Sequence, residues 1–187
     1  DKLILTYHGR ENMDALKAAV SNGCDAIYLG MQRFGARAYS SNFDLESLKE
    51  AISYCHLRNV KVYVTMNTIV FQDEIQDMKE QVKLLNETGV DGVIVQDLAV
   101  FNEIVDHYMD LEAHCSTQMG IDDLEGTLFF KELGAIRVVL SREVPIEKVK
   151  EITDISNELD EKGQETILKY ARSVKDNSNS RQDSSEP

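Results

Sequence analysis

A short apolar run followed by an amphipathic stretch recurs about every 25 to 30 residues, and this repeat constrains the fold more than any other feature. Most of the apolar runs are rich in branched residues, which is typical of strands that are covered on both faces in a parallel sheet. The sequence predicts six strands, at 3–6, 26–29, 60–65, 92–95, 111–115 and 136–140.

Between these runs, apolar residues recur at steps of three or four, which predicts helices with one face against the sheet. Residues that tolerate a left-handed backbone stand where four of these helices should end: Gly23, Asn59, Gly89 and Gly134. Asp44 and Asp122 are expected to cap the amino ends of the second and fifth helices.

Six successive βα units fit either a partial (β/α) barrel or an open doubly wound sheet, and spacing alone does not choose between them. No GxGxxG or GxxxxGK[ST] loop follows any strand, which weakens the dinucleotide-binding alternative. The sequence predicts an α/β domain over 1–152, an extra helical segment over 153–176, and a polar tail over 177–187 that we expect to be disordered.

The charge and the cysteines limit the classes of function. A net charge of -13 argues against an extended surface for nucleic acid, whose phosphates are bound by basic side chains. The three cysteines lack CxxC spacing, which favours reduced thiols over disulfides or a zinc site. No apolar run approaches the roughly 18 residues of a membrane span, and the amino terminus lacks a signal-peptide pattern. We therefore expect a cytoplasmic protein without a membrane partner.

Polar residues at the carboxyl ends of parallel strands face the hollow where the loops meet, so a functional site is expected there. The alternative is that these residues cap helices and solvate loops. The residues expected to bind a substrate are Arg37, Thr65, Asn67, Gln96, Ser116, Gln118 and Arg142. The residues expected to act in catalysis are Glu143, Asp97 and His8, although His8 has the alternative of a solvated loop histidine.

Asp97 and Glu143 would supply carboxylates for acid–base chemistry, but without a third ligand the sequence predicts no metal site. Arg142 suits an anionic substrate better than Arg137 does, because Arg137 stands near the start of its strand. An ion pair between Arg142 and Glu143 that aligns two strand ends is the structural alternative.

The cysteines are expected to be structural. His114 and Cys115 are neighbours on a strand and point to opposite faces, so they should not form a nucleophile–base pair with each other. Cys24 at a strand start and Cys55 on an apolar helical face are expected to be core thiols.

Several segments, in this order and spacing, resemble the collagenase-like peptidases of unassigned catalytic type, peptidase family U32. Together they span about residues 3 to 152. They read LKAAV (16–20), GCDAIYLG (23–30), RA (37–38), NF (42–43), VYVTMNT (62–68), GVDGVIVQD (89–97), HCSTQM (114–119) and RVVLSRE (137–143). Asn42 in the fourth segment joins the residues expected to bind a substrate.

This resemblance implies a TIM-barrel-like amino-terminal domain. Some members of the family are described as peptidases that attack collagen, and others support hydroxylation of tRNA or ribosomal RNA, or oxygen-independent hydroxylation in ubiquinone synthesis. In several hydroxylation members, cysteines beyond the segment that corresponds to residue 152 hold an iron–sulfur cluster. Those positions are absent from this sequence, so the resemblance implies no cofactor in this chain.

The resulting expectation is a peptidase, or its amino-terminal portion, that acts on a peptide or small-molecule substrate at the strand ends. The alternatives are an RNA hydroxylation factor of the same family and a catalytically silent binding or assembly module. The first strand ends in LTYHG instead of the Leu-Ala-Pro-Ala-Gly-like turn usual in the family, which favours the module. Because six strands do not close an eight-stranded barrel, we expect the tail, a second copy of the chain or a missing C-terminal part to cover the open sheet edge.

Overall fold

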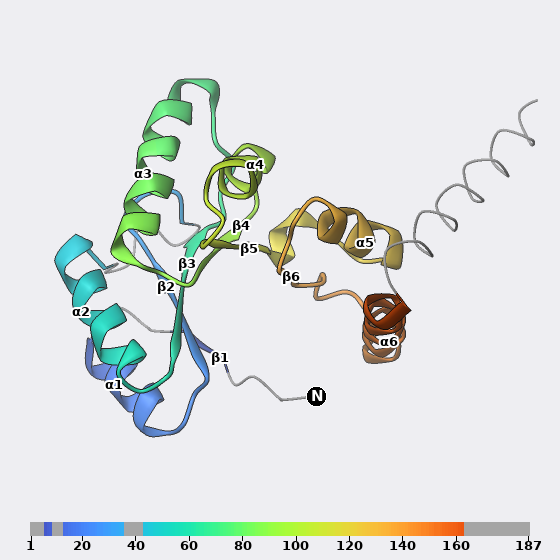
Figure 1. Cartoon of the computed structure of the whole chain (residues 1–187), viewed down its shortest axis with the longest axis horizontal. Helices are drawn as coiled ribbons and strands as arrows, with labels where there is room; N and C mark the ends of the chain where they lie inside the picture. The colour runs from blue at the N-terminus through green and yellow to red at the C-terminus, as the bar shows by residue number, and fades with distance from the viewer. Residues whose placement is uncertain (1–5, 9–12, 36–42, 163–187) are drawn as a thin grey trace, which may run out of the picture.

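The computed structural model describes residues 6–8, 13–35 and 43–162, with side chains for all of these except 6–8 and 157–162. Six parallel strands form one sheet in the order β1-β2-β3-β4-β5-β6 (Figure 1). The strands are β1 (Thr6–His8), β2 (Ala26–Gly30), β3 (Lys61–Met66), β4 (Gly92–Val95), β5 (Glu112–Cys115) and β6 (Arg137–Val138). Since β1 and β6 do not pair, the described strands form an open part of a barrel.

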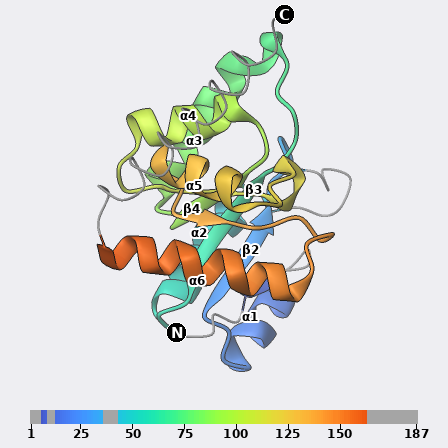
Figure 2. The ribbon, with the colours of Figure 1, turned by 90° about the vertical axis from the view of Figure 1, so that its right-hand side faces the viewer.

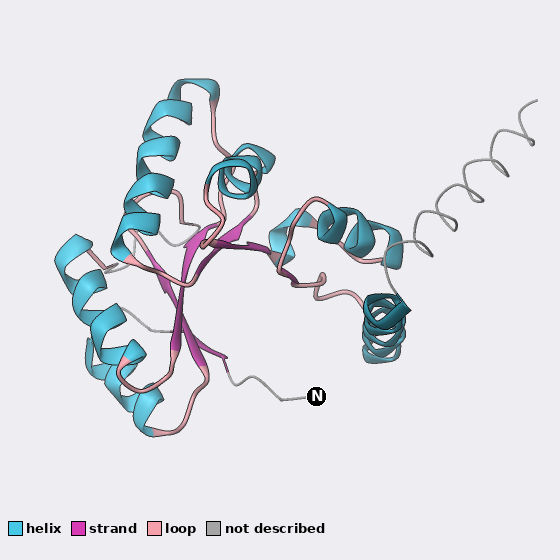
Figure 3. Ribbon diagram, viewed as in Figure 1, coloured by secondary structure: helices cyan, strands magenta, loops and turns pink. Residues whose placement is uncertain are grey.

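A helix follows each strand, as the βα repeat predicts. The helices α1 to α4 line the convex side of the curved sheet, whereas α5 and α6 lie beside β6 (Figure 3). They are α1 (Met13–Ser21), α2 (Leu45–His56), α3 (Ile75–Thr88), α4 (Leu98–His107), α5 (Leu124–Glu132) and α6 (Ile146–Lys162), with short 3-10 helices η1 (Gln72–Glu74) and η2 (Thr117–Met119). No helix in the described ranges is long and apolar enough to cross a membrane.

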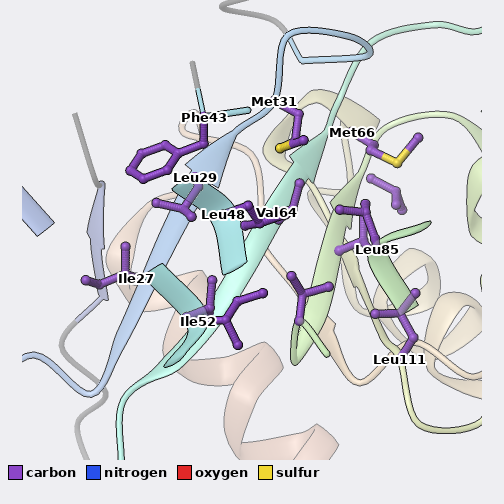
Figure 4. Packing of buried hydrophobic residues seen from close by; sticks show 14 of the residues in the cluster. Ile27, Leu29, Met31, Phe43, Leu48, Ile52, Val64, Met66, Leu85 and Leu111 are labelled. Carbon is purple, nitrogen blue, oxygen red and sulfur yellow. The ribbon is translucent and has the colours of Figure 1, made fainter. Parts of the chain in front are cut away.

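The core lies between the sheet and the helices of its convex side. Alternate strand residues such as Ile27, Leu29 and Val64 point into it and meet Leu48 and Ile52 of α2 (Figure 4). Full burial of an aliphatic side chain of this size contributes roughly 1.5 to 3 kcal/mol. The residues between them in sequence therefore point to the concave face.

The backbone signals in the sequence are largely confirmed. The predicted helix ends at Gly23, Asn59, Gly89 and Gly134 all have positive φ angles, between 56° and 106°. Asp44 caps α2 by accepting a hydrogen bond from the Ser47 backbone N–H at 2.9 Å.

The predicted cap of the fifth helix was wrong by one residue. Asp123, not Asp122, caps α5, and its carboxylate accepts a hydrogen bond from the Gly126 backbone N–H at 2.7 Å. Asp122 and Asp123 carry the same side chain, so the residue type does not show which of them is the cap. Only the backbone conformation distinguishes them.

The last two elements differ from their predicted extents. The sixth strand was predicted over 136–140, but only Arg137–Val138 pair with β5. α6 begins directly after Pro145 and continues through residue 152, the predicted end of the barrel-like domain. The rest of the predicted helical segment and the predicted disordered tail, 163–187, lie outside the described residues, as does the predicted strand start at 3–5.

Candidate functional site

Three polar residues stand side by side at the carboxyl ends of the central strands. Met66, Val95 and Cys115 are register partners on β3, β4 and β5. Asn67, Gln96 and Ser116 directly follow these partners, and strand alternation places them on the concave side of the sheet. We refer to Asn67, Gln96 and Ser116 as the rim row.

Local hydrogen bonds use part of the hydrogen-bonding capacity of the rim row and of the residues next to it. The Thr65 hydroxyl donates to the Leu29 carbonyl oxygen at 3.2 Å, and the Ser116 Oγ accepts from the Gln118 backbone N–H at 3.3 Å. Ser116 is buried, Asn67 and Gln96 are half-buried, and the Gln118 side chain is exposed. The structure thus brings four of the predicted substrate-binding residues together at one edge of the sheet, with Gln118 beside them on η2.

Asp97 has a structural role at this edge of the sheet. One carboxylate oxygen accepts from the Ala99 backbone N–H at 2.8 Å and caps α4. The other accepts from the Val70 backbone N–H at 3.1 Å. The carboxylate thereby ties the loop after β3 to the start of α4, and its predicted catalytic role stays a prediction.

The remaining predicted residues lie away from this row or outside the described side chains. Arg142 and Glu143 are exposed in the loop between β6 and α6, and neither forms an ion pair with another described residue. His8 lies on β1, whose side chains are not described, and Arg37 and Asn42 fall outside the described residues.

A polar cluster that was not predicted from the sequence occupies the concave face nearer the amino ends of the strands. Glu112 is its centre: one carboxylate oxygen accepts from Lys61 Nζ at 2.6 Å, and the other lies 2.8 Å from His114 Nε2. The His114 ring packs against the Tyr63 ring with centroids 4.5 Å apart, and the Arg137 guanidinium lies 5.3 Å from the Tyr63 centroid. We refer to these five residues as the concave cluster.

Burial governs the protonation of the concave cluster. Desolvation lowers the pKa of His114, whose side chain is 1 % exposed, and the nearby Arg137 charge lowers it further, against the raising effect of Glu112. His114 is therefore neutral near pH 7, and its Nε2–H donates to Glu112. Burial would raise the pKa of Glu112, but the hydrogen bonds from Lys61 and His114 outweigh it and hold that pKa below its ordinary value.

The neutral ring leaves His114 Nδ1 as an acceptor, and this atom is buried without a hydrogen-bond partner among the described residues. Such an atom is uncommon in a folded core. The sequence contained one signal of the cluster, because Lys61 and Tyr63, and likewise Glu112 and His114, are two residues apart on their strands. Which residues meet across strands depends on the register, which the sequence does not reveal.

Cys24 and Cys55 are core residues, as predicted, and Cys115 is buried as well. Cys115 belongs to the apolar core on the helix side of the sheet, opposite His114, so the two form no nucleophile–base pair. Burial raises the pKa of the Cys115 thiol to about 12 and that of Cys55 to about 11, and it also raises the pKa of Cys24. Thiols that are buried and protonated in this way do not fit an iron–sulfur cluster. Among the described residues, no group of three or more His, Cys, Asp or Glu could hold a metal ion.

The open parallel sheet, the helices on its convex side and the polar strand ends define a TIM-barrel-like α/β protein. Within that class, the chain belongs to peptidase family U32, whose family model matches residues 11–163.

Curated relatives carry names of two kinds. The chain is 34% identical over 143 residues to the "Uncharacterized protease MJ0090" of Methanocaldococcus jannaschii, covering 76% of this chain and 34% of that protein. It is 33% identical to "tRNA hydroxylation protein P1" of Bacillus subtilis, covering 79% of this chain and 36% of that protein. It is 34% identical to the "23S rRNA 5-hydroxycytidine C2501 synthase" of Escherichia coli, covering 73% of this chain and 20% of that protein. The chain thus spans about a third or less of the length of these relatives.

Solved structures agree on the fold. The U32 peptidase Mk0906 superposes with a TM-score of 0.64 at 19% sequence identity, over 82% of this chain and 66% of that one. A type I 3-dehydroquinate dehydratase from Clostridium difficile superposes with a TM-score of 0.57 at 12% identity, over 83% of this chain and 69% of that one. At these identities the similarity shows the fold alone.

Proposed function

We propose that this chain is part of the barrel of an RNA hydroxylation enzyme, and that the rim row contacts the base that is modified. The observation that carries this proposal is the alignment of Asn67, Gln96 and Ser116 at one level across three adjacent strands. Amide side chains present a donor and an acceptor side by side, which matches the edge of an unstacked RNA base. The hydroxyl of Ser116 adds a third hydrogen-bonding group to the row.

Two observations support an RNA substrate over a peptide. Relatives from Bacillus subtilis, Escherichia coli and Helicobacter pylori are named as tRNA hydroxylation proteins, and another is named as an rRNA hydroxycytidine synthase. The thiol nearest the rim, Cys115, faces the apolar core with its pKa raised to about 12, so it does not serve as a nucleophile for peptide hydrolysis.

The acidity of the chain limits how RNA would be held. With a net charge of -13, the chain offers little general attraction for phosphates. In this proposal, the contribution of this chain to the affinity for RNA comes from base contacts at the rim row. The redox step of hydroxylation is supplied from outside this chain, since its three cysteines do not fit an iron–sulfur cluster.

Nucleoside analysis of the host's RNA tests this function. Deletion of the gene that encodes this chain should remove a hydroxylated nucleoside from digests of tRNA or 23S rRNA, measured by mass spectrometry. The wild-type gene should restore it, whereas Asn67→Ala and Gln96→Ala should restore less than about a tenth, because each removes a pair of hydrogen bonds to the base. The exposed amide of Gln72 on η1 provides the matched control, and Gln72→Ala should restore the wild-type level. Unchanged hydroxylated nucleosides in the deletion strain would refute the proposal.

Peptide hydrolysis is the second candidate, because the relatives also include proteins named for proteolysis. Besides the protease of Methanocaldococcus jannaschii, a Porphyromonas gingivalis protein named "Collagenase" is 31% identical over 143 residues, which are 74% of this chain and 33% of that protein. In this case Glu143, Asp97 and His8 would act in catalysis.

Protein substrates separate the two candidates. Casein or gelatin turnover by the purified chain that disappears in Glu143→Gln would support the peptidase. Asp97→Asn keeps an acceptor oxygen for the backbone N–H groups of Ala99 and Val70, so it tests the charge of Asp97 without removing the cap of α4. Absence of turnover together with the loss of a hydroxylated nucleoside on deletion would exclude peptide hydrolysis as the main function.

A further inference from the structure

Large apolar side chains are exposed on the two loops that flank the rim row. Ile69 and Phe71, between β3 and α3, are 61 % and 66 % exposed, and Leu98 at the start of α4 is 53 % exposed. The segment that carries Ile69 and Phe71 extends outward from the end of β3 to the start of α3 (Figures 1 and 2). We refer to Ile69, Phe71 and Leu98 as the outer patch.

The outer patch is joined to the rim row through the backbone. The Val70 N–H donates to the Asp97 carboxylate at 3.1 Å and so holds the loop after β3 against the loop after β4. Asp97 directly follows Gln96 of the rim row, and Phe71 is four residues after Asn67. In an extended chain, four residues span at most about 14 Å. A polynucleotide with one base at the rim row therefore reaches the outer patch with a neighbouring base.

Hydrogen bonds fix the backbone of Phe71 in its exposed position. Its N–H donates to the Glu74 carboxylate at 2.9 Å, and its carbonyl oxygen accepts from the Glu74 backbone N–H at 2.9 Å. Val70 packs against the core, so its neighbours Ile69 and Phe71 share the opposite side of an extended stretch. Because this backbone is already ordered, a ligand of the outer patch does not have to order it on binding.

The spacing of Ile69 and Phe71 suits a flat ring. Residues i and i+2 of an extended chain lie about 6.6 Å apart, which is close to twice the roughly 3.4 Å between stacked bases of a nucleic acid. A single base therefore fits between the two side chains, with one face on each. Every base has a π-face, so stacking of this kind tolerates different sequences.

The charges near the outer patch favour contact with a base over contact with a phosphate. Three acidic residues, Asp73, Glu74 and Asp77, follow Phe71 within six positions. The Arg33 guanidinium lies 2.7 Å from the Asp77 carboxylate and is therefore already paired. Carboxylates repel a phosphate but not the uncharged face of a base, so stacking is the contact that this surface offers to RNA.

We propose that the outer patch stacks a base of the RNA that neighbours the modified base, with its faces on Ile69 and Phe71 and with Leu98 adding apolar surface. This inference rests on the proposed function, since it concerns the same RNA at the same edge of the sheet. A neighbouring base held in this way no longer stacks on the modified base. The modified base is then free for the hydrogen bonds of the rim row.

Binding of RNA from the deletion strain to the full chain tests the stacking. Total tRNA and 23S rRNA of that strain serve as probes, and filter binding measures their affinities. Phe71→Ala should weaken the RNA that binds at least fivefold, because it removes a stacking aromatic ring. Phe71→Trp keeps a flat ring and should bind at least as tightly as the wild type, whereas Phe71→Leu should have an intermediate affinity.

Phe129→Ala is the matched control, because Phe129 is also an exposed phenylalanine, at 55 %, but lies on α5 outside the outer patch. It should bind RNA as the wild type does, and an unfolding midpoint for each variant checks that it is folded. A hexanucleotide that contains 2-aminopurine reports stacking directly, since the fluorescence of this base falls when it stacks. The wild type and Phe129→Ala should quench it, and Phe71→Ala should not.

Equal RNA affinity of the wild type and Phe71→Ala would overturn the inference, and so would the absence of RNA binding by the wild type. Equal affinity together with a dimer in sedimentation velocity that Phe71→Ala dissociates would show that a second copy of the chain covers the outer patch.

Nucleoside analysis separates failure of this inference from failure of the proposed function. If deletion of the gene removes a hydroxylated nucleoside and Phe71→Ala restores it fully, the stacking is wrong and the function of the rim row stands. If deletion changes no nucleoside but RNA binding depends on Phe71, the proposed function is wrong and the stacking of RNA on the outer patch is supported.

Discussion

His114 combines two properties that rarely coexist in a histidine. It is almost fully buried, and it has a single hydrogen-bond partner among the described residues, the carboxylate of Glu112. Because burial lowers its pKa, the folded protein keeps the ring neutral, whereas in the unfolded chain it titrates near its ordinary value of 6.5. Protonation of His114 therefore destabilises the folded protein relative to the unfolded chain.

We expect the free energy of unfolding to fall as the pH drops from 7.5 to 5.5. A lowered pKa in the folded state gives stability that is present above the unfolded value of 6.5 and lost as the pH falls below it. Glu112 acts in the same direction below its ordinary value of 4.5, because its pKa is also lowered in the folded state. In His114→Gln, whose amide does not titrate, the slope should decrease by up to about 1.4 kcal/mol per pH unit. Urea unfolding at several pH values measures both slopes, and identical slopes would contradict this role of His114.

The three cysteines should resist alkylation in the folded protein. Each is buried with a raised pKa, so the reactive thiolate is scarce at pH 8 and the sulfur is out of reach. Mass spectrometry after iodoacetamide treatment should show no label under native conditions and three labels in urea. Rapid native labelling of Cys115 would show that it has the access and the thiolate character of a nucleophile.

At the scale of elements, a glycine at the start of β4 allows this strand to pack closely against β5. A Cβ atom at Gly92 would lie 2.7 Å from the Glu112 carbonyl oxygen and 2.8 Å from the Glu112 Cβ. Gly92 is the register partner of both Tyr63 and Glu112, so the bare backbone also leaves Lys61 of β3 room to reach across β4 to Glu112.

Gly92→Ala should therefore destabilise the protein by about 1 to 3 kcal/mol, because the added methyl group meets backbone atoms that cannot move away freely. Gly35→Ala is the control, since a Cβ at Gly35 would make only ordinary contacts, the nearest at 3.4 Å from the Met31 carbonyl oxygen. Urea unfolding of the two variants measures the difference. A smaller loss for Gly92→Ala than for Gly35→Ala would show that β4 and β5 shift apart without cost.

The elements themselves could be predicted because each depends on nearby sequence. Apolar period, glycines at helix ends and Asp44 as a cap are local signals, and they led to the correct order of strands and helices. The start of α6 was missed because Pro145 was not used as the signal of a helix start, and the strand at 136–140 was predicted too long because its apolar run continues past the pairing with β5.

The site could be predicted only in part for the same reason. Strand ends are visible in sequence, so Thr65, Asn67, Gln96 and Ser116 were predicted together, and the structure brings them to one edge. The concave cluster depends on which residues of β3, β5 and β6 face one another, and that is a property of register. Arg137 was set aside in favour of Arg142 because it stands at a strand start, yet it is Arg137 that joins the concave cluster, with its guanidinium over the Tyr63 ring.

At the scale of the whole molecule, its net charge of -13 opposes folding, because like charges lie closer together in the compact state. Several ion pairs between described residues join two exposed side chains, such as Arg33–Asp77 and Lys49–Glu46, and exposed pairs contribute little. Screening by salt should therefore relieve more repulsion than it removes attraction.

We expect the urea midpoint of unfolding to rise when NaCl is increased from about 10 to about 200 mM, over which the Debye length falls from roughly 30 to below 10 Å. A midpoint that falls with salt would mean that attractive ion pairs outweigh the overall repulsion.

The strand order β1-β2-β3-β4-β5-β6 also bears on how the protein is made. Each strand after β1 pairs with the strand synthesised just before it. When a strand leaves the ribosome, the strand with which it pairs has therefore already been synthesised. Pairing between consecutive strands closes shorter loops than pairing between distant strands, and no strand has to be inserted between two others. Synthesis from the amino terminus can thus build the sheet one βα unit at a time, in the order in which the units are translated.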